Sequence, residues 1–416
     1  MLAAALLIAT TTHQSALDKM FEPPMSKPLL PLMFPKPTGK SSMEFYVRAL
    51  DLVQTKPGIE AISNRLNGQD LGPSPTTKEI ADLNAALAEV RKGDKLPGDA
   101  STLFAQIPQT PKGRETLAQW DMAFGRRIKV ITKATCRVAY EQFDNGNSKQ
   151  ANENLLLMLR CLSDIKSGST FTALVATACD NMVLAAYNRT LSQLKTSDTS
   201  KIIKTVNALD SIDPYRKAMQ AEAKQSLSSA TMILEEFEKA LRAGDLEAND
   251  PDVKKAVTLY KKLTPEQRKA YARRLQAEMP KVMAPLLAQL NKPEYQWNLK
   301  QKSTSKYSSD PLMQLLLSVS GPDLFPSLLA SYAKTRTQIR LLRLHAYIRA
   351  YKIKTGQYPP SLATLTVGRA AYDPLANKPF QYNAYVTSYE LYSRGTMETG
   401  PIELRYQRKP GRTSYK

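Results

Sequence analysis

The segment from Lys354 to Leu365 reads KTGQYPPSLATL, and it decides how the last part of the chain folds. A basic helical pattern precedes it, and Gly356 suits the left-handed position that ends a helix. Two prolines then prevent a helical restart before Ser361, which is suited to cap a short turn. We therefore expect a structural corner, with Tyr358 folded back against the helix as an apolar contact.

The helix before this corner is predicted to run from about Phe325 to Lys354. Its apolar stripe can cover a sheet and comprises Leu341, Leu344, Ile348 and Tyr351. A second stripe is basic and is expected to stay in solvent; it comprises Arg336, Arg340 and Arg343. The corner thus connects a helix that has one apolar and one basic face to the C-terminal segment of the chain.

Strand-like alternation appears only after the corner, and it predicts a small antiparallel sheet. The three strand patterns lie at Phe380–Tyr382, Tyr389–Tyr392 and Ile402–Leu404. Turn residues precede the first strand, at Asp373-Pro374 and Asn377-Lys378-Pro379, and Gly395 follows the second.

Taken in order, these residues resemble the C-terminal globular part of type II secretion pseudopilins. In that family a helix reading A-Y-x-x-x-x-G-x-Y-P precedes a D-P-x-x-N/G-x-P-x-x-Y turn and a Y-x-L-x-S-x-G strand. The resemblance implies a module of one long helix and a short sheet. The residues that carry it are Tyr351, Gly356, Tyr358, Pro359, Leu362, Leu365, Asp373, Pro374, Asn377, Lys378, Pro379, Tyr382, Tyr389 and the run from there to Gly395.

Two departures from that family limit what the resemblance implies. Nothing at the N-terminus resembles the G-F-T-L-x-E prepilin-peptidase site, so we do not expect a pilus subunit. The stretch Gly395–Gly400 holds a single carboxylate, whereas the family often binds calcium there through aspartates, so we carry over no metal. The whole layout is also similar to sets of uncharacterised exported proteins from environmental bacteria such as planctomycetes, which implies export but no known activity.

The first 40 residues suggest export followed by a linker. Residues 1–16 contain an apolar run of signal-peptide size, although a short buried helix is the alternative. Residues 17–40 include FEPPMSKPLLPLMFPKPT, whose six prolines predict a linker or a strap rather than a regular helix. No later run is apolar and long enough to cross a membrane.

The long middle of the chain is predicted to be helical, in a domain spanning residues 41–320. Apolar residues recur at helical spacing, and FDNGNSKQA and DIKSGST mark helix stops followed by restarts. These breaks indicate helical hairpins, arranged either as an irregular bundle or as a solenoid. The predicted fold is therefore mainly α, with a C-terminal α+β module over residues 321–416.

The sequence contains no recognisable catalytic or cofactor motif. There are only two histidines, His13 and His345, so a histidine-based triad or zinc site has little to build on. Cys136, Cys161 and Cys179 lie in apolar helical patterns, which favours buried thiols, although a disulfide between two of them stays open. Glu235, Glu236 and Glu238 fit an ion-paired helix surface better than an acid/base pair. We expect no cofactor and no metal.

A net charge of +20 favours anionic partners. The candidate anion-binding residues lie on the helix before the corner: Arg336, Arg340, Arg343, Arg349, Lys352 and Lys354. The alternative for these residues is a solvated face on a generally basic protein.

Two hypotheses of function follow. The first is a non-enzymatic scaffold or interaction protein, exported to the periplasm or cell envelope, that binds an unknown protein or an anionic envelope component. The second is a polyanion-binding protein that uses the Arg336–Lys354 helix for nucleic acid, an envelope polymer or lipid headgroups. Nucleic acid is the poorer ligand if the chain is exported.

Overall fold

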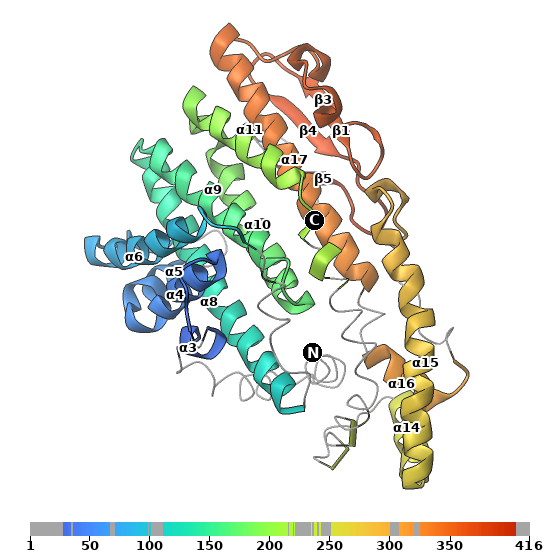
Figure 1. Cartoon of the computed structure of the whole chain (residues 1–416). Helices are drawn as coiled ribbons and strands as arrows, with labels where there is room; N and C mark the ends of the chain where they lie inside the picture. The colour runs from blue at the N-terminus through green and yellow to red at the C-terminus, as the bar shows by residue number, and fades with distance from the viewer. Residues whose placement is uncertain are drawn as a thin grey trace.

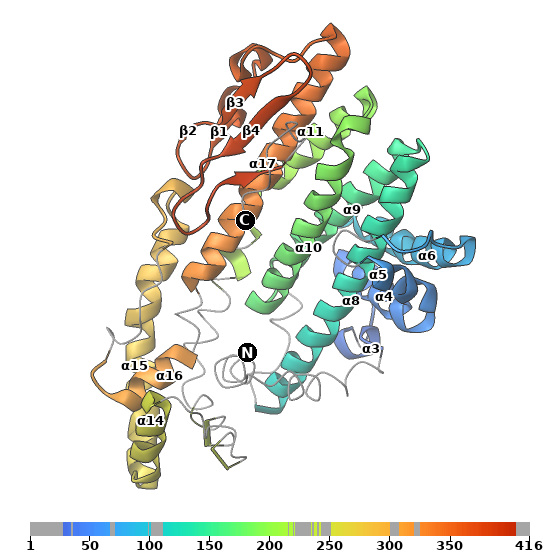
Figure 2. The same cartoon turned by 180° about the vertical axis from the view of Figure 1, so that it is seen from behind.

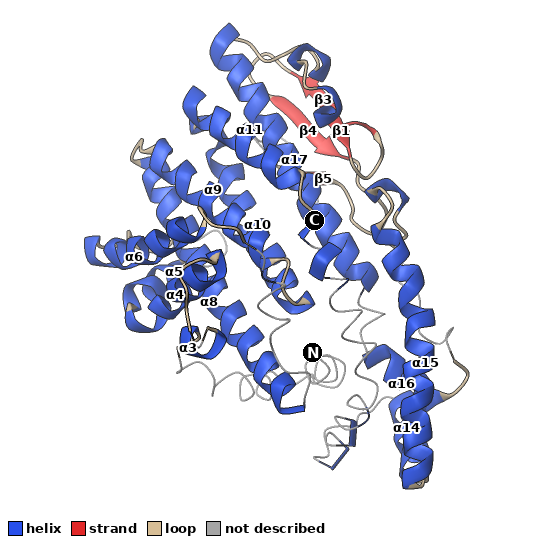
Figure 3. Ribbon diagram, viewed as in Figure 1, coloured by secondary structure: helices blue, strands red, loops and turns tan. Residues whose placement is uncertain are grey.

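The structure is a computed structural model, and it confirms a mainly helical protein with a small C-terminal antiparallel sheet (Figure 3). It describes residues 28–34, 36–66, 71–98, 100, 111–214, 216–218, 220, 234, 237–238, 241–242, 251–299, 308–319 and 325–404. The candidate signal segment 1–16 lies outside these residues.

Three short helices pack on a long one at the N-terminal end of the described chain. They are α4 (Ser42–Thr55), α5 (Pro57–Arg65) and α6 (Thr77–Gly93), and the long helix is α8 (Pro111–Asp144). α6 begins with a capping box in which the Thr76 and Glu79 side chains each accept from the other residue's backbone N–H. Their apolar faces, including Leu50, Leu83 and Leu87, are buried.

The proline-rich segment contains one helical turn that the sequence reasoning excluded. α3 spans Leu30–Met33, so the prediction of no regular helix is wrong there. A proline at the start of a helix loses no hydrogen bond, because the first N–H groups have no partner within the helix. The Asp51 carboxylate accepts hydrogen bonds from the N–H groups of Leu29 and Leu30, at 2.7 and 2.8 Å. Leu29 and Met33 are buried, so this segment lies against the helical body.

The centre of the molecule is built from helices joined by short turns. α9 (Ser148–Ile165) follows α8 after a turn at Gly146, whose φ of 75° needs glycine. α10 (Thr170–Thr190) begins where the Ser169 side chain accepts from the Thr172 N–H, and η2 (Leu191–Gln193) leads to α11 (Thr196–Asp210). α10 contacts α8, α9 and α17, while α11 contacts α9 and α17 (Figure 1).

An outer helical arm follows, with α14 (Pro251–Lys261), α15 (Pro265–Leu290), η3 (Glu294–Gln296) and α16 (Pro311–Val319). α15 starts with Thr264 as its cap and a proline at its first position, and Gln267 completes a capping box. Both α14 and α15 contact α16. Figures 1 and 2 place α14 and α15 along one outer edge of the molecule.

The C-terminal module is built around α17 (Phe325–Thr355). After η6 (Leu362–Leu365) and η7 (Gly368–Ala371), β1 (Tyr372–Asp373) pairs with β2 (Lys378–Pro379). A three-stranded antiparallel sheet follows in the order β3 (Gln381–Ala384), β4 (Tyr389–Ser393), β5 (Ile402–Glu403). The sheet covers one side of α17, and α10 and α11 contact the same helix from the helical body (Figure 2). This helix is therefore shared by both parts.

The corner after α17 has the geometry expected of Gly356 and Tyr358, but Ser361 does not cap η6, because its hydroxyl contacts the Thr364 hydroxyl instead of a backbone N–H. Gly356 has a φ of 80°, and its N–H donates to the Lys352 carbonyl at 2.8 Å. Tyr358 is buried, and its ring lies 4.9 Å from that of Tyr389. Tyr382 on β3 closes the corner by donating its hydroxyl to the Pro359 carbonyl at 2.7 Å.

Replacing Gly395 with alanine should destabilise the C-terminal module strongly. Its φ is 66°, and a Cβ there would lie 1.8 Å from the Gly400 carbonyl oxygen. We expect a loss of about 3 kcal/mol in the free energy of unfolding, measured by chemical denaturation. Gly356→Ala is the matched control, because its φ is also positive but nothing lies within 4 Å of a Cβ, so about 1 kcal/mol is expected. Equal losses in the two variants would contradict this account.

Candidate functional site

A dense group of partly buried, ion-paired charges surrounds Asp210, the last residue of α11. Three arginines of α17 approach its carboxylate: Arg340 Nε at 2.7 Å, Arg343 Nη1 at 3.3 Å and Arg336 Nε at 3.4 Å. They stand at positions i, i+4 and i+7, which share one face of a helix. The side chains of all four residues are between 8 and 18% exposed.

The end of α11 favours positive charge for reasons beyond the carboxylate. The last carbonyls of a helix lack partners within the helix, and its dipole places partial negative charge there. Arg336 Nη2 donates to the Asp210 backbone carbonyl at 3.1 Å, and Arg343 Nη1 donates to Asn207 Oδ1 at 3.0 Å. The three guanidinium groups therefore bind the whole C-terminus of α11.

Two further carboxylates balance the cluster. Glu294 of η3 lies 3.0 Å from Arg336 Nη1, and Asp213 lies 3.9 Å from the same atom. Tyr332 donates its hydroxyl to Asp213 at 3.0 Å and stacks on Trp297. Burial by itself would raise the pKa of Asp210, but the attraction of Arg340, Arg343 and Arg336 lowers that pKa below its ordinary value. The carboxylate is thus held ionised.

This geometry corrects the expectation that Arg336, Arg340 and Arg343 stay in solvent. α17 does not have one apolar face and one solvated face, because the helical body covers the side opposite the sheet. The basic stripe meets acidic residues of that body, and Asp210 is at least 126 residues away from each arginine in the sequence. These three arginines are therefore engaged inside the protein rather than presented to an outside anion.

The other candidate cations of α17 are dispersed. Arg349 Nε donates to the Leu194 carbonyl at 3.1 Å, and Lys352 Nζ lies 4.0 Å from the centre of the Tyr358 ring. Lys354 is exposed near the end of the helix. The six residues proposed from sequence therefore do not form one surface.

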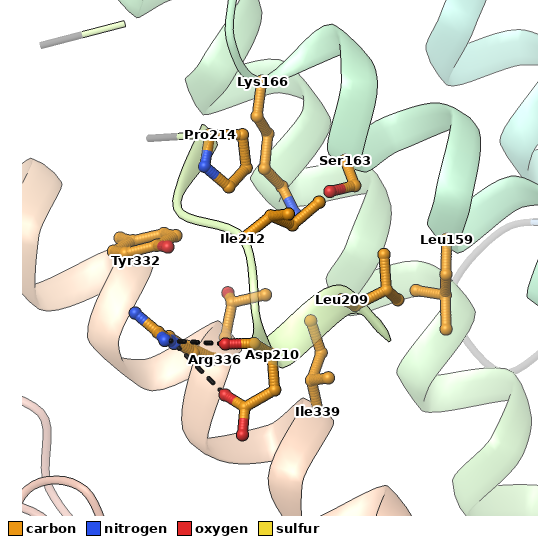
Figure 4. A pocket seen from close by; sticks show the side chains of 11 residues that line it. Leu159, Ser163, Lys166, Leu209, Asp210, Ile212, Pro214, Tyr332, Arg336 and Ile339 are labelled. Atoms are coloured by element: carbon orange, nitrogen blue, oxygen red, sulfur yellow. Dashed lines mark hydrogen bonds and ion pairs between the residues drawn. The ribbon is translucent and has the colours of Figure 1, made fainter. Parts of the chain in front are cut away.

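A small cavity lies next to the Asp210 cluster (Figure 4). Its volume is about 30 Å³, which suits water rather than an organic substrate. Lys166 points toward it but also donates to Asp180, a carboxylate that is completely buried. Burial raises the pKa of Asp180, while Lys166 opposes that rise. The cavity is lined by Leu159, Ser163, Lys166, Leu209, Asp210, Ile212, Pro214, Tyr332, Thr335, Arg336 and Ile339.

A larger and more open hollow of about 540 Å³ lies on the C-terminal module. η6, η7 and the β1–β2 pair surround it, and Arg369 is its only charged lining residue. The other lining residues are mostly apolar, and none pairs a nucleophile with a base. The hollow has the size of a ligand site but not the convergent polar groups of one.

The residues that carry the family resemblance meet in a buried junction of hydrogen bonds. Asp373 accepts from the Ser393 hydroxyl at 2.6 Å and from the Leu375 N–H at 2.9 Å. Ser393 Oγ in turn accepts from the Gly395 N–H at 2.9 Å. Asn377, with a φ of 50°, turns the chain into β2 before Pro379. These hydrogen bonds connect the Asp373-Pro374 turn to the end of β4 at Ser393–Gly395, so each segment stabilises the other.

His345 lies inside the module. It is 1% exposed, and its Nδ1 is 2.6 Å from the Tyr389 hydroxyl. Burial lowers the pKa of His345 to about 3, so the ring is neutral near pH 7. This histidine links α17 to β4.

The three cysteines are free and buried, on α8, α9 and α10. Burial raises the pKa of Cys136 and Cys179, so neither thiol is activated as a nucleophile. Within the described ranges, no group of histidine, cysteine and carboxylate side chains could hold a metal ion. Glu238 is ion-paired with Arg268 at 2.9 Å, whereas Glu235 and Glu236 lie outside the described residues.

Sequence reasoning missed a basic surface on α14 and α15. Residues 251–292 contain ten lysines and arginines against three acidic residues. Most of these cations are exposed. A count of charged residues along this segment would have identified these cations. The prediction was placed on α17 because that helix contains basic residues and no acidic ones.

In comparisons with known proteins, no protein family, no curated protein and no solved structure matches the chain. In the part of the chain that the structure describes, no helix is both long and apolar enough to cross a bilayer.

Replacing Asp210 with asparagine should loosen the joint between α11 and α17. The substitution leaves three partly buried guanidinium groups with less negative charge, so we expect the free energy of unfolding to fall by about 3 kcal/mol. Chemical denaturation measures this loss. Glu153→Gln is the control, because its pair with Lys201 is about 40% exposed on both sides and should contribute less than about 1 kcal/mol. A loss at Asp210 no larger than at Glu153 would refute a structural role for the cluster.

Stability should fall as the pH drops below 6.5. The unfolded chain binds a proton at His345 near its ordinary pKa of 6.5, whereas the folded chain binds it only near 3. Between these values the unfolded state holds more protons, so stability is full above pH 6.5 and is lost on acidification. We expect about 2 kcal/mol less free energy of unfolding at pH 5 than at pH 7.5.

Denaturation of His345→Gln over the same pH range provides the control, because glutamine does not titrate. Its stability should change little between pH 7.5 and pH 5. If the variant keeps the full pH dependence of the parent chain, His345 is not its source.

Proposed function

We propose that the chain is a non-enzymatic scaffold or interaction protein, exported to the bacterial cell envelope, whose C-terminal module resembles the globular part of pseudopilins. The observation that carries this proposal is the position of α17. It belongs to the C-terminal module through the sheet and to the helical body through Asp210. A module held in this way is a rigid platform rather than a tethered domain.

The platform offers two exposed apolar side chains on loops at the two ends of β4. Val386, in the loop between β3 and β4, is 98% exposed, and Met397, in the loop between β4 and β5, is 93% exposed. Burial of such apolar side chains by a partner stabilises the complex. They support a role in which the module contacts another protein.

Three titratable groups in the interior of the described structure connect elements of the fold. The carboxylate of Asp210, the ring of His345 and the carboxylate of Asp373 each join two elements of the fold. In an enzyme such groups would converge on a cavity that admits substrate. This use of titratable residues supports a scaffold over an enzyme.

The Arg336–Lys354 helix is a poor surface for a polyanion, because three of its six candidate cations bind the C-terminus of α11. An anionic envelope component remains a partner class within the proposal. Nucleic acid is disfavoured as long as export holds.

The proposal predicts an envelope location and a contact at the loops of the module. A photo-crosslinking residue in place of Val386 or Met397, introduced in the source bacterium, should give a discrete adduct in the envelope fraction. The same residue in place of Lys149, an exposed position on α9, should give little adduct. Recovery of the intact chain in the cytoplasm, with no adduct from either loop, would refute the proposal.

A further inference from the structure

α14 and α15 carry exposed cations that the fold itself does not use. Five side chains are exposed, and the structure pairs none of them with a carboxylate of the described residues. We call them the α14–α15 basic surface; its members are Lys254, Lys261, Lys262, Lys269 and Arg273.

The carboxylates near this surface are already engaged by other cations. Glu238 binds Arg268 at 2.9 Å, and Asp310 binds Arg274 at 3.0 Å. Glu238 also accepts a hydrogen bond from the hydroxyl of Tyr260 on α14, and Asp310 accepts one from the hydroxyl of Tyr271 on α15. Glu278 binds Lys281 at 2.9 Å, and Glu266 is exposed. These ion pairs leave the five cations of the basic surface without a carboxylate partner among the described residues.

The arm turns its apolar side chains inward. Ala256 and Tyr260 of α14 and Leu275 and Met279 of α15 are buried, and both helices contact α16. The exposed cations lie on other faces of these helices than the buried residues. Both helices run along the outer edge of the molecule in Figures 1 and 2.

The chemistry of the surface favours contact by charge alone. Four of the five cations are lysines, which act as hydrated point charges, whereas arginine is the better residue for fixed phosphate geometry. None of the exposed large hydrophobic side chains lies between residues 251 and 292 of the described structure. The surface thus lacks rings for stacking on unpaired bases and apolar side chains for insertion into a bilayer.

We propose that the α14–α15 basic surface binds the anionic phosphate headgroups of a lipid bilayer, as a peripheral contact without insertion. The proposal rests on the envelope location proposed above and supplies the means by which the scaffold is held there. Each lysine or arginine near an anionic bilayer strengthens partitioning about fivefold, so five of them suffice for reversible binding.

Vesicle co-sedimentation of the purified full chain tests the surface independently of location in the cell. The vesicles are phosphatidylcholine with or without about one third phosphatidylglycerol. The chain should bind only the anionic vesicles, and raising the salt to about 0.5 M should release it. Replacing all five cations of the surface with glutamine should weaken partitioning by at least about 30-fold.

A control variant removes the same charge elsewhere: glutamine replaces the exposed lysines Lys149, Lys204, Lys334, Lys354 and Lys378. It should keep most of the binding, and thermal unfolding checks that both variants fold. If both variants lose the same amount of vesicle binding, the net charge of the protein explains the binding and the proposed surface does not. Absence of binding to anionic vesicles, or tighter binding to a DNA duplex than to vesicles at equal salt, would overturn the lipid assignment. Neither result would refute the scaffold proposal, which the crosslinking experiment tests separately.

Discussion

The joint between the C-terminus of α11 and the basic stripe of α17 holds the two halves of this protein together. One carboxylate, one backbone carbonyl and one helix dipole converge where α11 ends, and three guanidinium groups meet them. Charges of this kind are costly to bury unless every partner is present. The position of α17, and with it the orientation of the sheet on its other side, therefore depends on this joint.

Much of the fold could be predicted from local signals. Thr76 and Thr264 cap helices, Gly146 and Gly356 end helices or turn the chain, and the alternating residues of β3 and β4 form strands. Each of these depends on interactions within a few residues, which a sequence displays directly. The short β1–β2 pair was not predicted as strands, although its turn residues were, because two residues per strand leave no alternation to detect.

The candidate site could not be predicted in the same way. A stripe of arginines on a helix has the same pattern whether it faces water or a carboxylate, and Asp210 lies too far away in sequence to be recognised as its partner. Periodicity identifies a face of a helix but not what covers that face. The expectation of a solvated stripe assumed that α17 has one covered side, whereas the sheet and the helical body cover two.

The separation between Asp210 and its arginines also constrains the order in which this chain can reach its native state. Asp210 precedes Arg336 by 126 residues, so α11 cannot complete its terminus until most of the protein has been synthesised. Contacts of such long range close late in folding and at a cost in chain entropy. Before that moment the surfaces of α10 and α11 that α17 covers are open to other chains or to chaperones. A chain that stops before Arg336 would keep those surfaces exposed, so quality control could distinguish incomplete copies from complete ones by this one missing helix.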